Sequence, residues 1–142
     1  MHIVIQGAGR GLGLAFAHHA LRAGATKLYL TARNPQDCEG FSQLQPSDHV
    51  QWFNLDFLNS DQIASTGEAI LTATPHIDRV IVTAGVLHNG EIQPEKRVEA
   101  LEAEAMLYLY QVNAMGPVLF LKSLWPALRR AHPVTAASLS AR

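Results

Sequence analysis

The sequence predicts an α/β protein with a doubly wound parallel sheet, and three observations support this fold class. Short apolar runs typical of buried strands alternate with helix-like segments along the chain, as they do in βαβ units. A glycine-rich turn, Gln6–Gly13, separates the first apolar run from the first helical segment. The length of 142 residues suits one domain with one hydrophobic core, so residues 1–142 are expected to fold together.

Strands are expected where short apolar runs lie between turn-forming residues. Five segments fit this description: His2–Ile5, Lys27–Thr31, Val50–Leu55, Arg79–Thr83 and Pro133–Leu139. The alternation with helices predicts the strand order 3-2-1-4-5. In a sheet of this kind, ligands bind at the carboxyl ends of the strands, at the switch between the first and fourth strands.

Helices and loops are expected between these strands. The first helix covers Leu14–Leu21, and a second occupies residues 60–75, where Ser60 and Asp61 are typical of a helix start. The polar segment 36–47 predicts a loop with at most a short helix. A polar loop is also expected over residues 86–97.

The last predicted helix is long. Apolar residues recur at spacings of three, four and seven from Val98 to Phe120, which is the period of an α-helix. This helix is expected to run to about Ala131, with Pro126 as the point at which it would break.

Composition and charge exclude several classes of protein. A hydrophobic content of 48% with 16% charged residues suits a globular protein rather than a disordered one. The net charge of −1 gives no reason to expect nucleic acid or a membrane surface as a partner. Cys38 is the only cysteine, so a cytoplasmic protein without an intrachain disulfide is expected. The seven histidines are scattered, and no metal site is expected.

The glycine-rich turn predicts a phosphate-binding site. Gly7, Gly11 and Gly13 fit the spacing G-x-x-x-G-x-G and not G-x-G-x-x-G, and no Gly-Lys-Ser/Thr of an ATPase phosphate loop follows them. Glycine allows the backbone to turn tightly and a ligand to approach it closely. The following helix offers unpaired N–H groups and a positive dipole end to a dinucleotide pyrophosphate.

Several motifs together resemble the N-terminal part of the short-chain dehydrogenase/reductase family. Besides the glycine motif, they are Leu55-Asp56, Thr83-Ala84-Gly85 and Val112-Asn113, and they extend over the whole chain in the family's order. The ending from His132 to Arg142 is similar to the branch of C-factor-like proteins and small carbonyl reductases. The resemblance implies a Rossmann fold, a nicotinamide dinucleotide cofactor and a carbonyl or alcohol substrate.

The cofactor-binding residues can be assigned on this basis. They are expected to be Gly7, Arg10, Gly11, Leu12, Gly13, Arg33, Asp56, Phe57, Ala84 and Gly85. In the family, the residue at Asp56 accepts a hydrogen bond from the adenine amino group, and the alternative interpretation is an acid at a helix N-terminus or a loop cap. Thr83 stands where the family has asparagine, so a side-chain role there does not follow from the resemblance.

Charge predicts NADP rather than NAD as the cofactor. An NAD site has a carboxylate at the end of the second strand, where it binds the ribose 2′-hydroxyl, and Thr31 stands there instead. Arg33 follows two residues later, and Arg10 lies inside the glycine turn. Guanidinium groups suit a 2′-phosphate, which arginine can bind with two hydrogen bonds. The alternative is that each is an ordinary exposed arginine.

Asn113 is a candidate catalytic residue. It is a poor helix former in the middle of the long helix, and Pro117 stands four residues later without an N–H, so the Asn113 carbonyl loses its helical hydrogen-bond partner. In the family this asparagine bends the helix and anchors a water of a proton relay, whereas a simple proline kink is the alternative. The family's substrate-orienting serine is expected at Ser140, with Ser138 as the second choice.

The family's general acid is a tyrosine followed four residues later by a lysine, and no Tyr-x-x-x-Lys occurs in these 142 residues. The chain therefore stops where this catalytic segment is expected, before the later strands. It is either the cofactor-binding part of an oxidoreductase or a non-catalytic dinucleotide-binding or signalling module. A methyltransferase-like nucleoside binder is a third interpretation, against which Thr31 argues. The wide apolar stripe on the long helix predicts a homo-oligomer.

Overall fold

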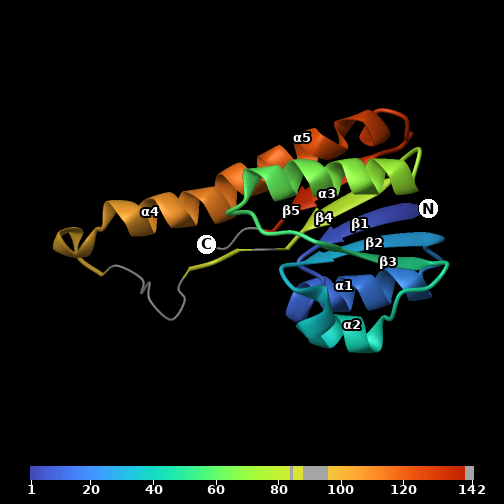
Figure 1. Cartoon of the computed structure of the whole chain (residues 1–142), viewed down its shortest axis with the longest axis horizontal. Coiled ribbons are helices and arrows are strands. Elements are labelled where there is room, and N and C mark those ends of the chain that lie inside the picture. Colours follow the sequence, from blue (N-terminus) through green and yellow to red (C-terminus); the bar gives the residue numbers. More distant parts are fainter. Residues whose placement is uncertain (84, 88–95, 140–142) are drawn as a thin grey trace.

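The computed structural model describes residues 1–83, 85–87 and 96–139, and its centre is a five-stranded parallel sheet. The strand order is β3-β2-β1-β4-β5, which confirms the predicted topology (Figure 1). Their bounds are β1 His2–Gln6, β2 Lys27–Ala32, β3 Val50–Asn54, β4 Arg79–Val82 and β5 Thr135–Ser138.

Helices cover both faces of the sheet (Figure 1). On one face lie α1 (Gly11–Arg22) and the short α2 (Glu39–Gln43), which follows a 3-10 turn, η1 (Pro35–Asp37). On the other face lie α3 (Ser60–Ala73) and α5 (Gly116–Leu128).

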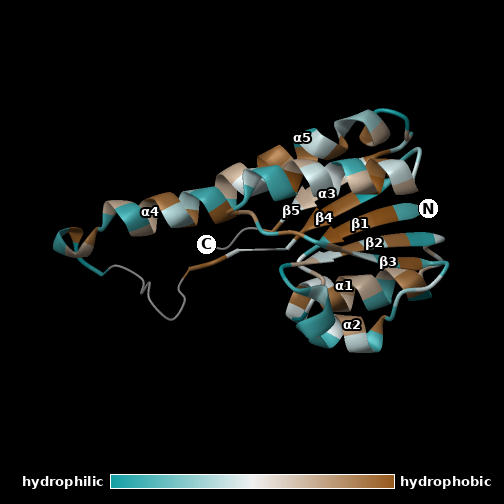
Figure 2. Cartoon of the chain, viewed as in Figure 1, coloured by the Kyte–Doolittle hydropathy of each residue, from teal (hydrophilic) through white to brown (hydrophobic). Residues whose placement is uncertain are grey.

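The two hydrophobic cores follow from strand alternation, because successive side chains of a strand point to opposite faces. Ile3 and Ile5 of β1 pack with Leu28 and Leu30 of β2 beneath α1. The intervening Val4 belongs to the second core, together with Phe120 and Leu124 of α5 and residues of α3. The strands β1 and β4 are accordingly apolar along most of their length, as Figure 2 shows.

The helices α3 and α5 pack closely against each other at a glycine. A Cβ atom added at Gly67 of α3 would overlap the side chain of Ser123 in α5. Asn59 caps the start of α3, since its Oδ1 accepts the Gln62 N–H at 2.9 Å. This helix therefore begins one residue after its cap, at the expected Ser60.

The predicted long helix is wrong at its beginning and correct in its later part. Residues Val98–Ala100 form a 3-10 turn, and α4 (Ala103–Tyr110) begins only afterwards. A π-helical segment, Gln111–Met115, joins α4 to α5. Pro126 does not break α5. No residue of α4 is buried, and Figure 1 shows α4 extending beyond the sheet. Because no residue of α4 is buried, the apolar periodicity of the sequence alone does not define where this helix begins.

Other features bear on the remaining expectations. The short helix α2 lies within the segment predicted to be mostly loop. Most of the predicted loop 86–97 lies outside the described residues. In the described ranges, no helix combines the length and hydrophobicity that crossing a bilayer requires.

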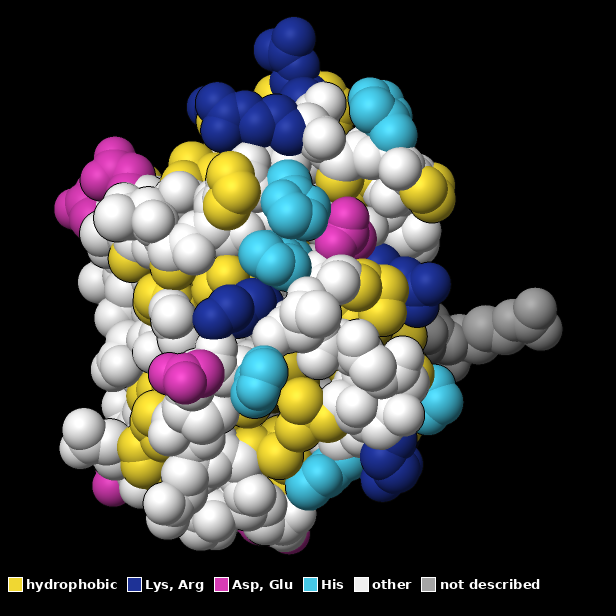
Figure 3. All heavy atoms as spheres, turned by 90° about the vertical axis from the view of Figure 1, so that its right-hand side faces the viewer, with side chains coloured by type: hydrophobic (Ala, Val, Ile, Leu, Met, Phe, Trp, Pro, Cys, Tyr) yellow, Lys and Arg dark blue, Asp and Glu magenta, His cyan; other side chains and the backbone are white. Residues whose placement is uncertain are grey.

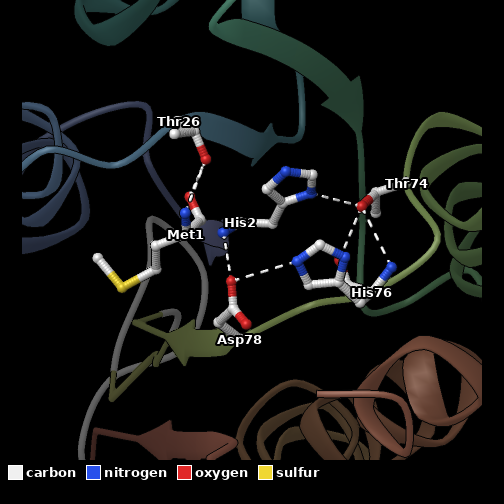
Figure 4. Close-up of polar contacts among 6 residues, drawn as sticks. All are labelled: Met1, His2, Thr26, Thr74, His76 and Asp78. Carbon is white, nitrogen blue, oxygen red and sulfur yellow. Dashed lines mark hydrogen bonds and ion pairs between the residues drawn. The ribbon is translucent and has the colours of Figure 1, made fainter. Parts of the chain in front are cut away.

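Two stacked histidines lie at the amino ends of the strands, where histidine side chains gather on the surface (Figure 3). The rings of His2 and His76 are 4.3 Å apart with an angle of 21° between them (Figure 4). His2 Nδ1 lies 2.7 Å from the Thr74 hydroxyl. Asp78 accepts the His2 backbone N–H at 2.6 Å and lies 3.6 Å from His76 Nε2. This cluster fastens the start of β1 to the start of β4.

Burial, and after it the neighbouring His76 and the N-terminal ammonium, lowers the pKa of His2 below its ordinary 6.5, against the opposing effect of Asp78. The folded protein therefore takes up a proton at His2 less readily than the unfolded chain does. The stability contributed by neutral His2 is present above pH 6.5 and is lost as the pH falls through the lowered pKa.

We expect the free energy of unfolding to fall as the pH is lowered below 6.5, the ordinary pKa of histidine, and to fall less steeply in His2→Asn. Urea unfolding at several pH values measures both slopes. His19→Asn is the matched control, because His19 is exposed on α1. Equal slopes for the His2 variant and the unaltered chain would contradict the assignment.

Candidate cofactor-binding site

A large open cleft lies at the carboxyl ends of the strands, at the predicted switch between β1 and β4. The cleft has a volume of about 1080 Å³, and it lies at the other end of the strands from the His2 cluster. Nine of the ten predicted cofactor-binding residues line it: Gly7, Arg10, Gly11, Leu12, Gly13, Arg33, Asp56, Phe57 and Gly85. The tenth, Ala84, lies outside the described residues. Residues distant in sequence therefore meet at one site.

The glycine loop between β1 and α1 holds a conformation that requires glycine. Gly7 has φ of 82° and Gly11 has φ of 56°, in the left-handed region that other residues rarely adopt. The carbonyl of Thr31 in β2 accepts the N–H of Gly7 at 3.1 Å and that of Ala8 at 3.0 Å. The start of the loop is thereby fixed to the neighbouring strand.

Gly13 is the point of closest approach between α1 and the loop. A Cβ atom at this position would overlap the Gly7 carbonyl group and would lie 2.8 Å from Thr83 Oγ1. The Thr83 hydroxyl in turn donates to the Gln6 carbonyl at 2.7 Å, which connects the end of β4 to the end of β1. The sequence did not predict this role for Thr83. Thr83 also lines the cleft.

The amino end of α1 can accept an anion. Arg10 is the N-cap residue but makes no side-chain capping hydrogen bond, and no acidic residue lies in the first turn. The N–H groups of Gly11, Leu12 and Gly13 find no acceptor among the described residues. The side chain of Leu12 is 65% exposed, so solvent reaches this end of the helix. Such an uncapped helix start suits a phosphate group.

The structure corrects the argument about the end of β2. Thr31 is completely buried and does not line the cleft, whereas Ala32 does. The reason is strand alternation, which turns Ala32 to the side of Leu28 and Leu30 and turns Thr31 to the opposite side. Ala32 also carries no carboxylate, so the absence of an acid at the end of β2 still holds.

The charged groups of the cleft are mixed. Arg10 and Arg33 are exposed at the cleft, and the same cleft is lined by the carboxylates of Asp37, Glu39 and Asp56. Among the described residues, neither arginine forms an ion pair with a carboxylate. Both guanidinium groups are therefore available to a ligand.

Asp56 and Phe57 follow β3 and line the cleft from the side of α3. Asp56 Oδ1 accepts the Leu58 N–H at 3.0 Å, and the Asp56 N–H donates to Gln62 Oε1 at 2.6 Å. Asp56 therefore caps the loop after β3, and its contact with adenine stays a prediction. Phe57 packs against Phe120 with ring centroids 6.1 Å apart. A Cβ atom at Gly116 would overlap the Phe57 side chain.

Asn113 lies in the π-helical segment and does not line the cleft. Its side chain binds both backbone polar groups of Val86: Oδ1 accepts the N–H at 2.8 Å and Nδ2 donates to the carbonyl at 2.7 Å. The π-helical segment ends just before Pro117, the residue without an N–H. The structure therefore gives Asn113 an anchoring contact after β4 that the sequence did not predict. Its part in a proton relay stays a prediction.

The predicted serines cannot be assigned to the site. Ser140 lies outside the described residues. Ser138, the second choice, is the exposed last residue of β5. Tyr108 of α4 does line the cleft, but Val112 stands four residues later where the family's acid has a lysine.

The sequence did not predict the wall of the cleft that follows β2. Asn34, Asp37, Cys38 and Glu39 line it, and they come from the turn η1 and the start of α2. Pro35 at the first position of η1 is the one local signal that could have indicated this turn. Within the described residues, no group of three histidine, cysteine or acidic side chains is arranged to hold a metal ion.

The comparisons with known proteins agree with this geometry. A family model described as short chain dehydrogenase matches residues 1–138. The chain is 29% identical over 142 residues to 3-dehydrosphinganine reductase TSC10B from Arabidopsis thaliana, covering 98% of this chain and 40% of that protein. It is 29% identical to Dehydrogenase/reductase SDR family member 7B from Bos taurus, covering 99% of this chain and 44% of that protein.

The solved structures include a carbonyl reductase from Pseudomonas aeruginosa PAO1 in complex with NADP. It superposes with a TM-score of 0.82 at 28% identity, covering 99% of this chain and 60% of that one. The chain spans less than half the length of the two curated relatives named above. The family match over residues 1–138 and the strand order with its glycine loop lead to one conclusion: the chain belongs to the short-chain dehydrogenase/reductase family.

Proposed function

We propose that this chain is the cofactor-binding part of an NADP-dependent oxidoreductase that acts on a carbonyl or alcohol substrate. The observation that carries the proposal is the uncapped start of α1 beneath the glycine loop, with Arg33 exposed in the same cleft. The carbonyl reductase of similar structure was solved with NADP, which supports the same cofactor. We also propose a cytoplasmic location, with which a single cysteine is compatible.

The residues present fit a dinucleotide. The close approach at Gly13 and the left-handed Gly7 leave the backbone accessible to a diphosphate, which the N–H groups of Gly11 and Leu12 would bind. Arg33 would bind the 2′-phosphate of the adenosine ribose, because Ala32 brings no carboxylate against it. When bound, the nicotinamide supplies or accepts the hydride.

A second candidate is a dinucleotide-binding or signalling module that performs no chemistry. The observation that favours it is that Tyr108, the tyrosine that lines the cleft, is followed four residues later by Val112 and not by a lysine. General acid catalysis typically contributes about 10²- to 10⁴-fold to a rate. Saturable NADPH oxidation with a panel of carbonyl compounds would distinguish the two candidates.

Calorimetric titration with NADPH and NADH tests the cofactor. In Arg33→Ala, NADPH binding should weaken by about 1.5–3 kcal/mol, the scale of a hydrogen bond to a charged group. This corresponds to a factor of about 10 to 150 in Kd. NADH binding should stay nearly unchanged, since NADH lacks the 2′-phosphate. Arg79→Ala is the matched control, because Arg79 is exposed at the other end of the sheet. An equal loss for both nucleotides would remove the 2′-phosphate argument.

Gly13→Val tests the glycine loop. Its side chain would meet the Gly7 carbonyl group and the Thr83 hydroxyl, so the loop must move away from α1. We expect a lower Tm and no measurable binding of NADPH by calorimetry. Ala15→Val, on an exposed position of the same helix, should bind NADPH normally. If folded Gly13→Val kept its NADPH affinity, the glycine loop would be only a turn.

We also propose that the chain self-associates through the α4 and α5 surface. Five large apolar side chains there are exposed by half or more: Met106, Leu107, Tyr110, Val118 and Trp125. Burial of apolar surface contributes about 25 cal/mol per Å², so a few hundred Å² would contribute several kcal/mol before the costs of association.

Light scattering coupled to size exclusion should detect a dimer or a larger assembly. Leu107→Lys should shift the distribution toward monomer, because a charge then replaces an apolar side chain in the contact. Val134→Lys is the control, since Val134 is an exposed apolar residue outside both helices. A monomer at high protein concentration would contradict self-association.

A further inference from the structure

The short helix α2 contacts the glycine loop directly, although the sequence predicted mostly loop in this region. The N–H of Gly40 in α2 donates to the carbonyl of Gly9 at 2.8 Å. Gly40 is buried, and Gly9 lines the cleft. The connection between β2 and β3 is thereby bonded to the centre of the loop.

Glycine is present on both sides of this contact, where a side chain would overlap the backbone at Gly40 and would be tightly packed at Gly9. A Cβ atom at Gly40 would overlap the Ala8 carbonyl oxygen and would lie 3.0 Å from Trp52 Cη2. A Cβ atom at Gly9 would lie 3.1 Å from Cys38 Cβ. The two backbones therefore approach each other as closely as their hydrogen bond requires.

The other end of α2 is fixed to the sheet and to α1. Trp52 of β3 donates its indole N–H to the Leu44 carbonyl at 2.7 Å, and its ring lies 5.9 Å from that of Phe41. Gln43 Oε1 lies 2.8 Å from His18 Nε2 of α1. Movement of α2 away from the loop would disturb these contacts, so α2 is a fixed support for the Gly9 carbonyl.

The bond to Gly9 determines the direction of the next N–H. In a planar trans peptide, the C=O of one residue and the N–H of the following residue point in opposite directions. Since the Gly9 carbonyl faces α2, the Arg10 N–H points away from α2. This N–H has no acceptor among the described residues. Arg10 lines the cleft as the N-cap of α1.

We infer that Gly40 is a positioning residue for dinucleotide binding: by holding the Gly9 carbonyl, it directs the Arg10 N–H toward the diphosphate of the cofactor. The inference rests on the proposed function, because it presupposes that the cleft binds a dinucleotide. It adds α2 to the parts of the chain that determine affinity, although Gly40 itself does not line the cleft.

Gly40→Ala tests the inference with two ligands. The added methyl group should move α2 from the loop and weaken NADPH binding about tenfold or more, as the loss of a hydrogen bond to a charged group does. Adenosine 2′-monophosphate has no diphosphate, so its Kd should change less than about twofold. Calorimetry or NMR titration measures both constants. A general loss of folded protein would affect the two ligands alike.

Phe41→Ala provides a second variant that adds no clash. It removes packing against Trp52 and should weaken NADPH binding several-fold through the looser α2, although Phe41 does not line the cleft. Leu71→Ala is the matched control, because Leu71 is a partly buried residue of α3 in the other core and should leave NADPH affinity unchanged.

The outcomes separate the two proposals. Failure of the unaltered chain to bind NADPH overturns the proposed function and this inference with it. If the unaltered chain binds NADPH, unchanged affinity in folded Gly40→Ala overturns the inference alone, and so does an equal loss for both ligands. If Gly40→Ala does not fold, equal NADPH affinities of Phe41→Ala and Leu71→Ala overturn it.

Discussion

The close approach of Gly13 to the Gly7 carbonyl is the constraint on which the rest of the site depends. It brings the start of α1 directly against the loop that leaves β1, and the left-handed conformation of Gly7 makes the approach possible. Thr83 then bonds the end of β4 to the end of β1 at the same place. The uncapped N–H groups of α1 consequently lie at the switch point between β1 and β4, where the strand order reverses and a bound diphosphate can reach them.

Three separate connections support this loop, and they come from β2, from the helix α2 and from the residue after β4. The Thr31 carbonyl holds its beginning, the Gly40 N–H holds its middle and the Thr83 hydroxyl holds the strand before it. All three are backbone groups or a short side chain, which leaves little freedom for adjustment. A binding site built in this way is largely formed before the ligand arrives, so less conformational entropy is lost on binding.

The sequence predicted the sheet order and the cofactor-facing loops because both depend on local patterns. Apolar runs give the strands, and strand ends give the cleft, so Gly7, Asp56 and Gly85 could be placed together without coordinates. The wall made by η1 and α2 was not predicted, since it depends on contact between segments far apart in the chain. The two hydrogen bonds of Asn113 to Val86 were missed for the same reason. The start of α4 was missed for the opposite reason, because no residue of α4 is buried and apolar periodicity alone does not define its first residue. The sequence predicted Thr31 as the end of the second strand, whereas β2 extends one residue further to Ala32.

The π-helical segment has a geometric consequence for the surface beyond it. A π turn contains one residue more than an α turn, and one residue corresponds to about 100° of rotation around an α-helix. The side chains of α4 are therefore rotated by about a quarter of a revolution relative to a continuous α-helix through Gln111–Met115. The side of α4 on which Met106 and Leu107 lie is thus determined outside α4, by the one additional residue of the π-helical segment.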